Sequence, residues 1–232
     1  DNGDKEKCGK TREGLWNYCI SEIDAFNDII TELKSKPFYT GKDIEGLLSF
    51  IILYEKLNGE IKKSDVLLRE VLELKIADAC RLELQPRAPH KDFLNKLIAR
   101  KSNDPRIQLF TTNYDLLFEM AANEGGFVVI DGFSFTQPRK FSGRYFDYDI
   151  VNSEKTRMKQ EESFVSKVFH LYKLHGSLNW YKDELGNIVQ QDKPKKPLII
   201  YPASEKYESS YEQPYFEMMS RFQQALRKEN VL

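Results

Sequence analysis

Apolar residues recur at helical spacing through most of the first hundred positions. Residues three or four positions apart share one face of a helix, so each such stretch predicts an amphipathic helix. The stretches span about Leu15–Leu33, Ile44–Ile52, Val66–Ala79 and Phe93–Ile98. Asp43 is a candidate N-cap for the second, and Asn58–Gly59 is a stop signal. The pattern therefore predicts a mostly helical portion over about residues 12–102.

The pattern changes after Pro105, where short runs typical of strands appear. They lie at Ile107–Thr111, Phe127–Ile130 and Lys167–Leu174. A helix is expected from about Asp115 to Asn123, between the first two strands. Strand, helix and strand with short connections form a βαβ unit, which implies a parallel sheet. We therefore predict an α/β fold, with a Rossmann-like parallel sheet flanked by helices over about residues 103–232.

The remaining sequence predicts shorter elements around that sheet. Residues 131–166 are polar and aromatic, and we expect an irregular excursion over a site or interface. Trp180–Tyr181 and Ile188–Val189 suggest a hairpin. Leu198–Tyr201 resembles another strand, and Tyr215–Lys228 a final helix with Pro214 at its first turn.

Composition narrows the class of protein. Lys plus Arg is 35 and Asp plus Glu is 36, which gives a net charge of −1 and no general basis for nucleic-acid binding. Aromatic residues make up 12%, which excludes a disordered or low-complexity chain. No stretch approaches the roughly 18 apolar residues of a membrane span. The three cysteines, Cys8, Cys19 and Cys80, form no CxxC pair, which argues against a disulfide framework and a structural zinc site. These features predict a cytoplasmic protein.

Polar residues follow the first predicted strand, in the run Thr111–Thr112–Asn113–Tyr114–Asp115. Ligands of open parallel sheets bind just beyond the carboxyl ends of the strands, and a helix N-terminus there adds unpaired N–H groups. The alternative is that Thr111, Thr112 or Asn113 only caps the following helix, and composition alone favours this capping interpretation.

His175 follows another predicted strand, and Gly176 beside it allows close approach of the backbone. A histidine at a strand end can act as a general base at neutral pH. The alternative is a structural histidine, which is the more frequent case. His170, inside the strand, is expected to be structural, and His90 is expected to cap or pack.

Together the two motifs point to a known family. FTTNYDLLFE at 110–119 and LHGSLNW at 174–180 resemble the sirtuin-like NAD-consuming domains, especially those of bacterial antiphage defence proteins. In sirtuins the corresponding motifs are Thr-Gln-Asn-Ile-Asp and a strand that ends in His-Gly, in the same order. The resemblance covers about residues 90–232 and implies a single NAD-binding domain over residues 1–232.

The chain also departs from the family pattern. No segment matches the Gly-rich phosphate loop or the late Gly-rich strand, so we expect the sequence to be truncated at both ends. Three scattered cysteines cannot build the four-cysteine zinc module of deacetylating sirtuins. The resemblance therefore points to NAD hydrolysis rather than deacetylation, with NAD⁺ as substrate and no zinc.

The resemblance implies roles for residues in both motifs. Asn113 holds the ribose or orients water, and His175 acts as the base. Thr112, which replaces the family's usual Gln, and Asp115 line the nicotinamide end. Further contacts are expected from three positions, Thr111, Gly176 and Ser177.

The family pattern also implies that the activity is regulated, because loss of NAD⁺ is toxic to the cell. It suggests a homo-oligomer, or a trigger such as a HerA-like ATPase or a phage component. From the composition, we expect no membrane partner and no direct nucleic-acid partner, because the chain has no long apolar stretch and no surplus of basic residues. The apolar helices between Gly41 and Leu84 are candidates for an interface, although core packing explains them equally well. The alternatives are a catalytically silent sirtuin-like scaffold, a nucleotide-binding module without hydrolysis and a protein deacylase.

Overall fold

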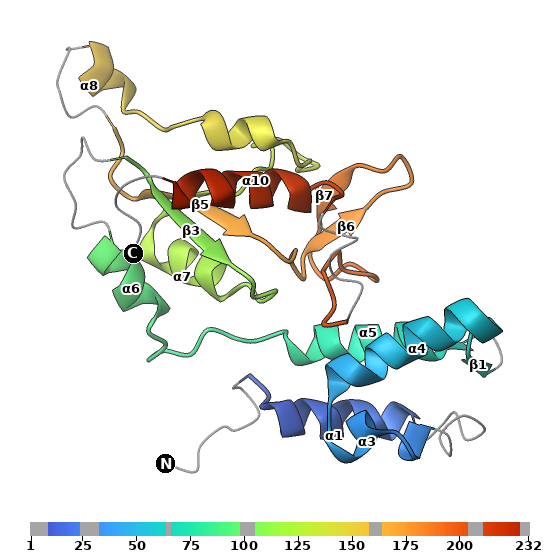
Figure 1. The fold of residues 1–232 in the computed structure, drawn as a ribbon. Coiled ribbons are helices and arrows are strands. Elements are labelled where there is room, and N and C mark those ends of the chain that lie inside the picture. Colours follow the sequence, from blue (N-terminus) through green and yellow to red (C-terminus); the bar gives the residue numbers. More distant parts are fainter. Residues whose placement is uncertain are drawn as a thin grey trace. The chain divides into compact units, whose positions relative to one another are not determined.

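A computed structural model describes residues 9–23, 33–63, 66–97, 105–157, 164–203 and 211–227. The chain forms two compact units (Figure 1). Unit 1 is Asp1–Leu82 with Ile199–Glu212, and unit 2 is Glu83–Leu198 with Gln213–Leu232. Within the described residues, no helix is long and apolar enough to cross a membrane.

Unit 1 is mainly helical, as the hydrophobic spacing predicts. Its helices are α1 (Arg12–Ile23), α3 (Pro37–Thr40), α4 (Ile44–Asn58) and α5 (Leu68–Ala79). Leu47, Leu48 and Ile51 of α4 are fully buried in one core with Leu68 and Leu72 of α5. The spacing of these leucines and isoleucines thus places one apolar face of each helix inward.

Three details of unit 1 differ from the prediction or go beyond it. Residues 24–32 of the first predicted helix lie outside the described residues. Lys62–Lys63 (β1) and Val66–Leu67 (β2) form a small antiparallel pair that the helical spacing does not reveal. Asp43 occupies the N-cap position of α4 but makes no side-chain capping bond, and it pairs instead with Arg12 at 3.2 Å.

Unit 2 is built on a parallel sheet of three strands in the order β3–β5–β4. The strands are β3 (Ile107–Thr111), β4 (Val128–Ile130) and β5 (Val168–Lys173). Helix α7 (Leu117–Gly125) connects β3 to β4, and Gly126 ends it in a left-handed conformation. This confirms the predicted α/β, Rossmann-like fold with a helical N-terminal part.

Helices cover both faces of this sheet, so the central strand β5 is buried along its whole length (Figure 1). Alternate residues point to opposite faces. Phe169 and Leu171 pack with α7 and α6 (His90–Leu97), and Val168 and Tyr172 pack with α10 (Tyr215–Leu226). A strand covered on both faces reads as an almost continuous apolar run, which explains why the sequence predicts it correctly.

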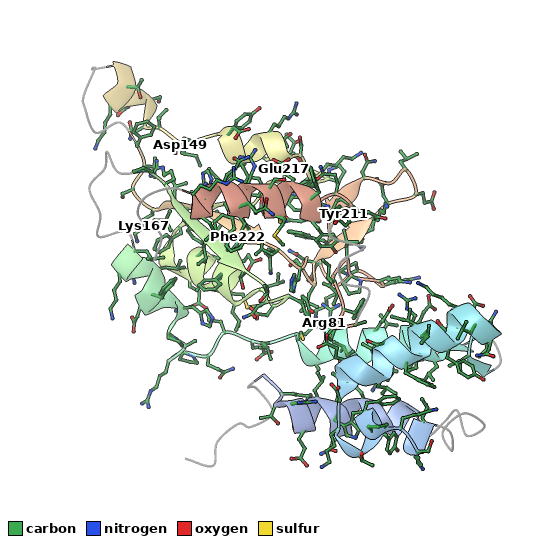
Figure 2. All side chains as sticks on the ribbon, viewed as in Figure 1. Arg81, Asp149, Lys167, Tyr211, Glu217 and Phe222 are labelled. Carbon is green, nitrogen blue, oxygen red and sulfur yellow. The ribbon has the colours of Figure 1, made fainter. Side chains whose placement is uncertain are left out.

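Aromatic side chains fill the space between the sheet and α10. Phe222 of α10, labelled in Figure 2, packs on Phe110 of β3 with ring centroids 5.1 Å apart. Phe110 and Phe146 each stack on Tyr172 of β5, with centroids at 4.4 and 4.2 Å. Such stacked and tilted pairs add to the stabilisation from buried area alone.

The long excursion after β4 is ordered by ion pairs at its described residues. It contains a 3₁₀ helix, η2 (Gly143–Asp147), and a short helix, α8 (Ser153–Arg157). Arg221 of α10 binds Asp147 at 2.8 Å and the main-chain oxygen of Gly143 at 2.9 Å. Arg106 binds Asp149, also labelled in Figure 2, at 2.8 Å.

The predicted hairpin is confirmed, whereas the strand predicted at Leu198–Tyr201 is wrong. β6 (Trp180–Lys182) and β7 (Ile188–Gln190) pair antiparallel. In the following apolar run, Leu198 exchanges main-chain bonds with Trp180 and Ser177 and Ile199 forms an isolated β-bridge, but the run is not a strand. Prolines flank it at 197 and 202, and their missing N–H groups shorten any ladder.

Candidate active site

The two sequence motifs meet at the carboxyl edge of the sheet. Thr111 is the register partner of Lys173, and the N–H of Leu174 donates to the Thr111 oxygen at 2.8 Å. Beyond the strands, the N–H of Leu178 donates to the Tyr114 oxygen at 3.1 Å. The loops that carry Asn113 and His175 are therefore joined through their main chains.

The loop after β3 uses some of its polar side chains on itself. The Thr111 hydroxyl oxygen accepts a bond from the Asn113 N–H at 3.1 Å. Asp115 Oδ1 accepts one from the Leu117 N–H, at the start of α7, at 3.0 Å. Thr112 and Asn113 are exposed. The capping alternative for Thr111, Thr112 or Asn113 is wrong, because the N-cap of α7 is Leu116 and no side chain caps it. Thr111 and Asp115 form local turns instead, and the side chains of Thr112 and Asn113 are accessible to a ligand.

The loop after β5 is a tight turn. The Gly176 N–H donates to the Lys173 oxygen at 3.1 Å, and Gly176 has a φ of +85°, which favours glycine. Ser177 is fully buried, and its hydroxyl donates to Asn179 Oδ1 at 2.8 Å. His175, which precedes Gly176 in this turn, is half-buried. The turn thus presents His175 at the edge and directs Ser177 inward.

Lys173 lies beneath both loops, and the motif analysis assigns it no role. Its side chain is 3% exposed. The ammonium donates to the main-chain oxygens of Tyr114 and Asp115 and forms an ion pair with Glu119 Oε1 at 2.9 Å. Burial raises the pKa of Glu119 above its usual value, and Lys173 opposes this shift. The sequence signal that could have identified it is a charged residue, Lys173, near the end of a mostly apolar strand.

The third strand, β4, also ends in a polar cluster at this edge. Asp131 follows Ile130 directly and is 8% exposed. Its carboxylate accepts bonds from Arg139 at 2.7 Å and from Gln190 Nε2 at 2.8 Å. The same pattern that marks Thr111 and His175, a polar residue at or just after the end of an apolar strand, could have identified Asp131.

The exposed side chains of Thr112 and Asn113 carry hydrogen-bonding groups at this edge. Hydroxyl and amide groups of Thr112 and Asn113 can exchange hydrogen bonds with ribose hydroxyls or a carboxamide. Among the described residues, no group of three or more His, Cys, Asp or Glu side chains is arranged to hold a metal ion.

A parallel sheet with helices on both faces and polar loops at its carboxyl edge defines a Rossmann-like α/β protein, a class whose ligands bind at that edge. Residues 108–232, more than half of the chain, match the SIR2-like domain family, and the chain belongs to this family. SIR2-like domains bind NAD⁺, and the family includes NAD-dependent enzymes. No curated protein matches the chain. The roles of Asn113, His175 and their neighbours stay predictions.

Proposed function

We propose that the protein is an NAD⁺ hydrolase that cleaves the bond between nicotinamide and ribose. The observation that carries the proposal is the joining of the two motif loops, through Leu174 to Thr111 and through Leu178 to Tyr114. This arrangement sets an amide and an imidazole on adjacent turns at the edge where such sheets bind ligands.

The proposed chemistry passes through an oxocarbenium-like transition state at the ribose carbon. Bond cleavage releases nicotinamide, and water adds to the ribose, by analogy with glycoside hydrolysis. Asn113 holds the ribose or orients the water, and His175 accepts the proton from water or from a ribose hydroxyl. Thr112 and Asp115 line the nicotinamide end. Thr111, Gly176 and Ser177 are the further candidates for contact with NAD⁺.

The test is nicotinamide release from NAD⁺ by purified protein. Asn113→Ala and His175→Ala should each abolish release while circular dichroism and the melting temperature stay close to those of the wild type. Asn123→Ala, an exposed position on α7, is the matched control and should retain full release. Full turnover by either motif variant would contradict the assignment. NAD⁺ binding without any nicotinamide product from the wild type would favour a binding module instead.

The resemblance to sirtuin-like defence proteins supports a biological setting for this activity. The proposed enzyme acts in bacterial antiphage defence by depleting NAD⁺, under the control of self-association or of a partner such as a HerA-like ATPase. Nicotinamide release measured across protein concentrations, and with and without a candidate partner, tests this control. A rate per molecule that never changes would contradict it.

A further inference from the structure

The most unusual residue of the sheet is the lysine at the end of its central strand. Lys173 is 2% exposed as a residue, and its neighbours on β5 are mostly apolar. A buried ammonium loses its hydration, which costs several kcal/mol unless polar partners replace the water. The hydrogen-bond partners of the Lys173 ammonium therefore indicate which part of the structure the buried charge stabilises.

Among the described residues, all acceptors of the Lys173 ammonium belong to the segment that follows β3. Two are main-chain oxygens, those of Tyr114 and Asp115, and the third is the Glu119 carboxylate in the first turn of α7. The ammonium thus fixes the backbone immediately after Asn113. Main-chain acceptors hold a loop path directly, independently of any rotamer.

The main chain of Lys173 holds the second motif, the turn that carries His175. Its carbonyl accepts the Gly176 N–H at 3.1 Å and closes the turn around His175. Its register partner on β3 is Thr111, at the base of the Asn113 loop. One residue therefore anchors both loops, one by its side chain and one by its backbone.

Stability alone does not account for this arrangement. Replacing a buried ion pair by apolar residues of similar volume is often neutral or stabilising, because desolvation offsets the attraction between the charges. What an apolar pair cannot supply is the two bonds to the loop carbonyls. The specific contribution of Lys173 is therefore the geometry of the loop.

We propose that Lys173 is a positioning residue for the reaction proposed above, fixing the Asn113 loop relative to His175. The inference rests on that proposed function. Misplacing a reacting group by about 1 Å can lower a rate about 100-fold, so loss of the clamp should reduce turnover more than binding.

The experiment compares Lys173→Met with Lys173→Met/Glu119→Leu. The single variant leaves the half-buried Glu119 carboxylate without its cation, so it should melt at a lower temperature than the wild type. The double variant removes both charges and should recover most of that melting temperature. Because neither variant has an ammonium for the loop carbonyls, kcat should be about 100-fold lower in both, with KM changed less than about threefold.

Arg69→Met/Glu73→Leu is the matched control, since this ion pair in α5 also has one buried partner, Glu73, which pairs with Arg69 at 2.8 Å. It should retain the wild-type kcat. Recovery of kcat together with stability in the Lys173/Glu119 double variant would overturn the proposal, because it would assign Lys173 a purely structural role.

Amide hydrogen exchange without NAD⁺ separates the two proposals. In Lys173→Met, the N–H groups of Asn113, Leu117 and Leu178 should exchange about tenfold faster, since each bonds within or onto the loop. Unchanged exchange would overturn the positioning role. A wild-type protein that releases no nicotinamide would overturn the proposed function, while the exchange rates would still decide whether Lys173 holds the loop.

Discussion

Polar side chains in unit 2 differ in whether the fold satisfies their hydrogen bonds. Lys173 and Asp131 are buried, and each has several partners within hydrogen-bonding distance. His170 of β5 is less well satisfied. Its Nδ1 lies 3.3 Å from the Tyr172 hydroxyl, and its buried Nε2 has no hydrogen-bond partner among the described residues. The imidazole therefore has little to compensate a positive charge.

The pKa of His170 accordingly falls to about 4, chiefly because burial desolvates the charged ring. Arg106 and Arg221 lower it further, whereas Asp149 and Asp147 oppose the shift. Between pH 6.5 and 4 the unfolded chain binds a proton at His170 and the folded chain does not. The free energy of unfolding must therefore decrease as the pH falls through this range.

We expect His170 to account for about 2 kcal/mol of the stability lost between pH 7 and pH 5. His170→Gln keeps a polar group near Tyr172 but does not titrate, so its loss over the same range should be smaller by about that amount. Urea unfolding of both proteins at the two pH values measures the difference. Equal losses in the two proteins would show that His170 is charged in the folded state or is solvated there.

At the scale of single elements, the start of α7 shows how the site is supported. The first N–H groups of a helix have no partner within the helix. Asp115 satisfies that of Leu117 with its carboxylate, and Lys173 occupies the main-chain oxygens of Tyr114 and Asp115. The helix start and the candidate catalytic loop are thus one hydrogen-bonded structure.

Asp115→Ala should lower the free energy of unfolding by about 1 kcal/mol, because an N–H at the helix start loses its acceptor. Asp115→Asn should stay within about 0.5 kcal/mol of the wild type, since an amide oxygen accepts the same bond. Chemical denaturation measures both values. If Asp115→Asn is as unstable as Asp115→Ala, the carboxylate charge matters more than the hydrogen bond.

At the scale of the molecule, the chain is divided between two units with separate cores. Trp16 is 4% exposed in the core of unit 1, and Trp180 is 1% exposed in the core of unit 2. These are the two tryptophans of the sequence. Each unit therefore carries its own fluorescent reporter.

Single-tryptophan proteins, made with Trp16→Phe or Trp180→Phe, should report the units separately. Leu72→Ala in unit 1 should shift the transition seen by Trp16 more than that seen by Trp180, and Leu171→Ala in unit 2 should do the reverse. Each substitution removes a fully buried side chain and should cost about 2–5 kcal/mol. Fluorescence during urea unfolding gives the midpoints. Equal shifts for both reporters would indicate one cooperative transition.

The sequence predicts elements well where hydrophobic spacing is long or the strand is buried on both faces. The helices α4 and α5 and the strand β5 are examples. It fails at Leu198–Tyr201, where an apolar run is buried but its flanking prolines limit pairing. Apolar character shows that a segment is buried and does not show that it joins a sheet.

The candidate site could be located from the sequence but not assembled from it. The position of polar residues after apolar strands points to Asn113 and His175. The clamp of Lys173 on the Asn113 loop joins residues almost sixty positions apart, and no local pattern encodes such a contact.

The sequence by itself determined the α/β class, the βαβ unit and the two motifs, because hydrophobic period and strand-end polarity are local properties. Tertiary structure decided the strand order β3–β5–β4, the joining of the motif loops and the division of the chain into two units. These depend on which distant segments pair and bury one another. Long-range hydrogen bonds and packing stabilise these arrangements, and each such contact needs residues from two distant segments.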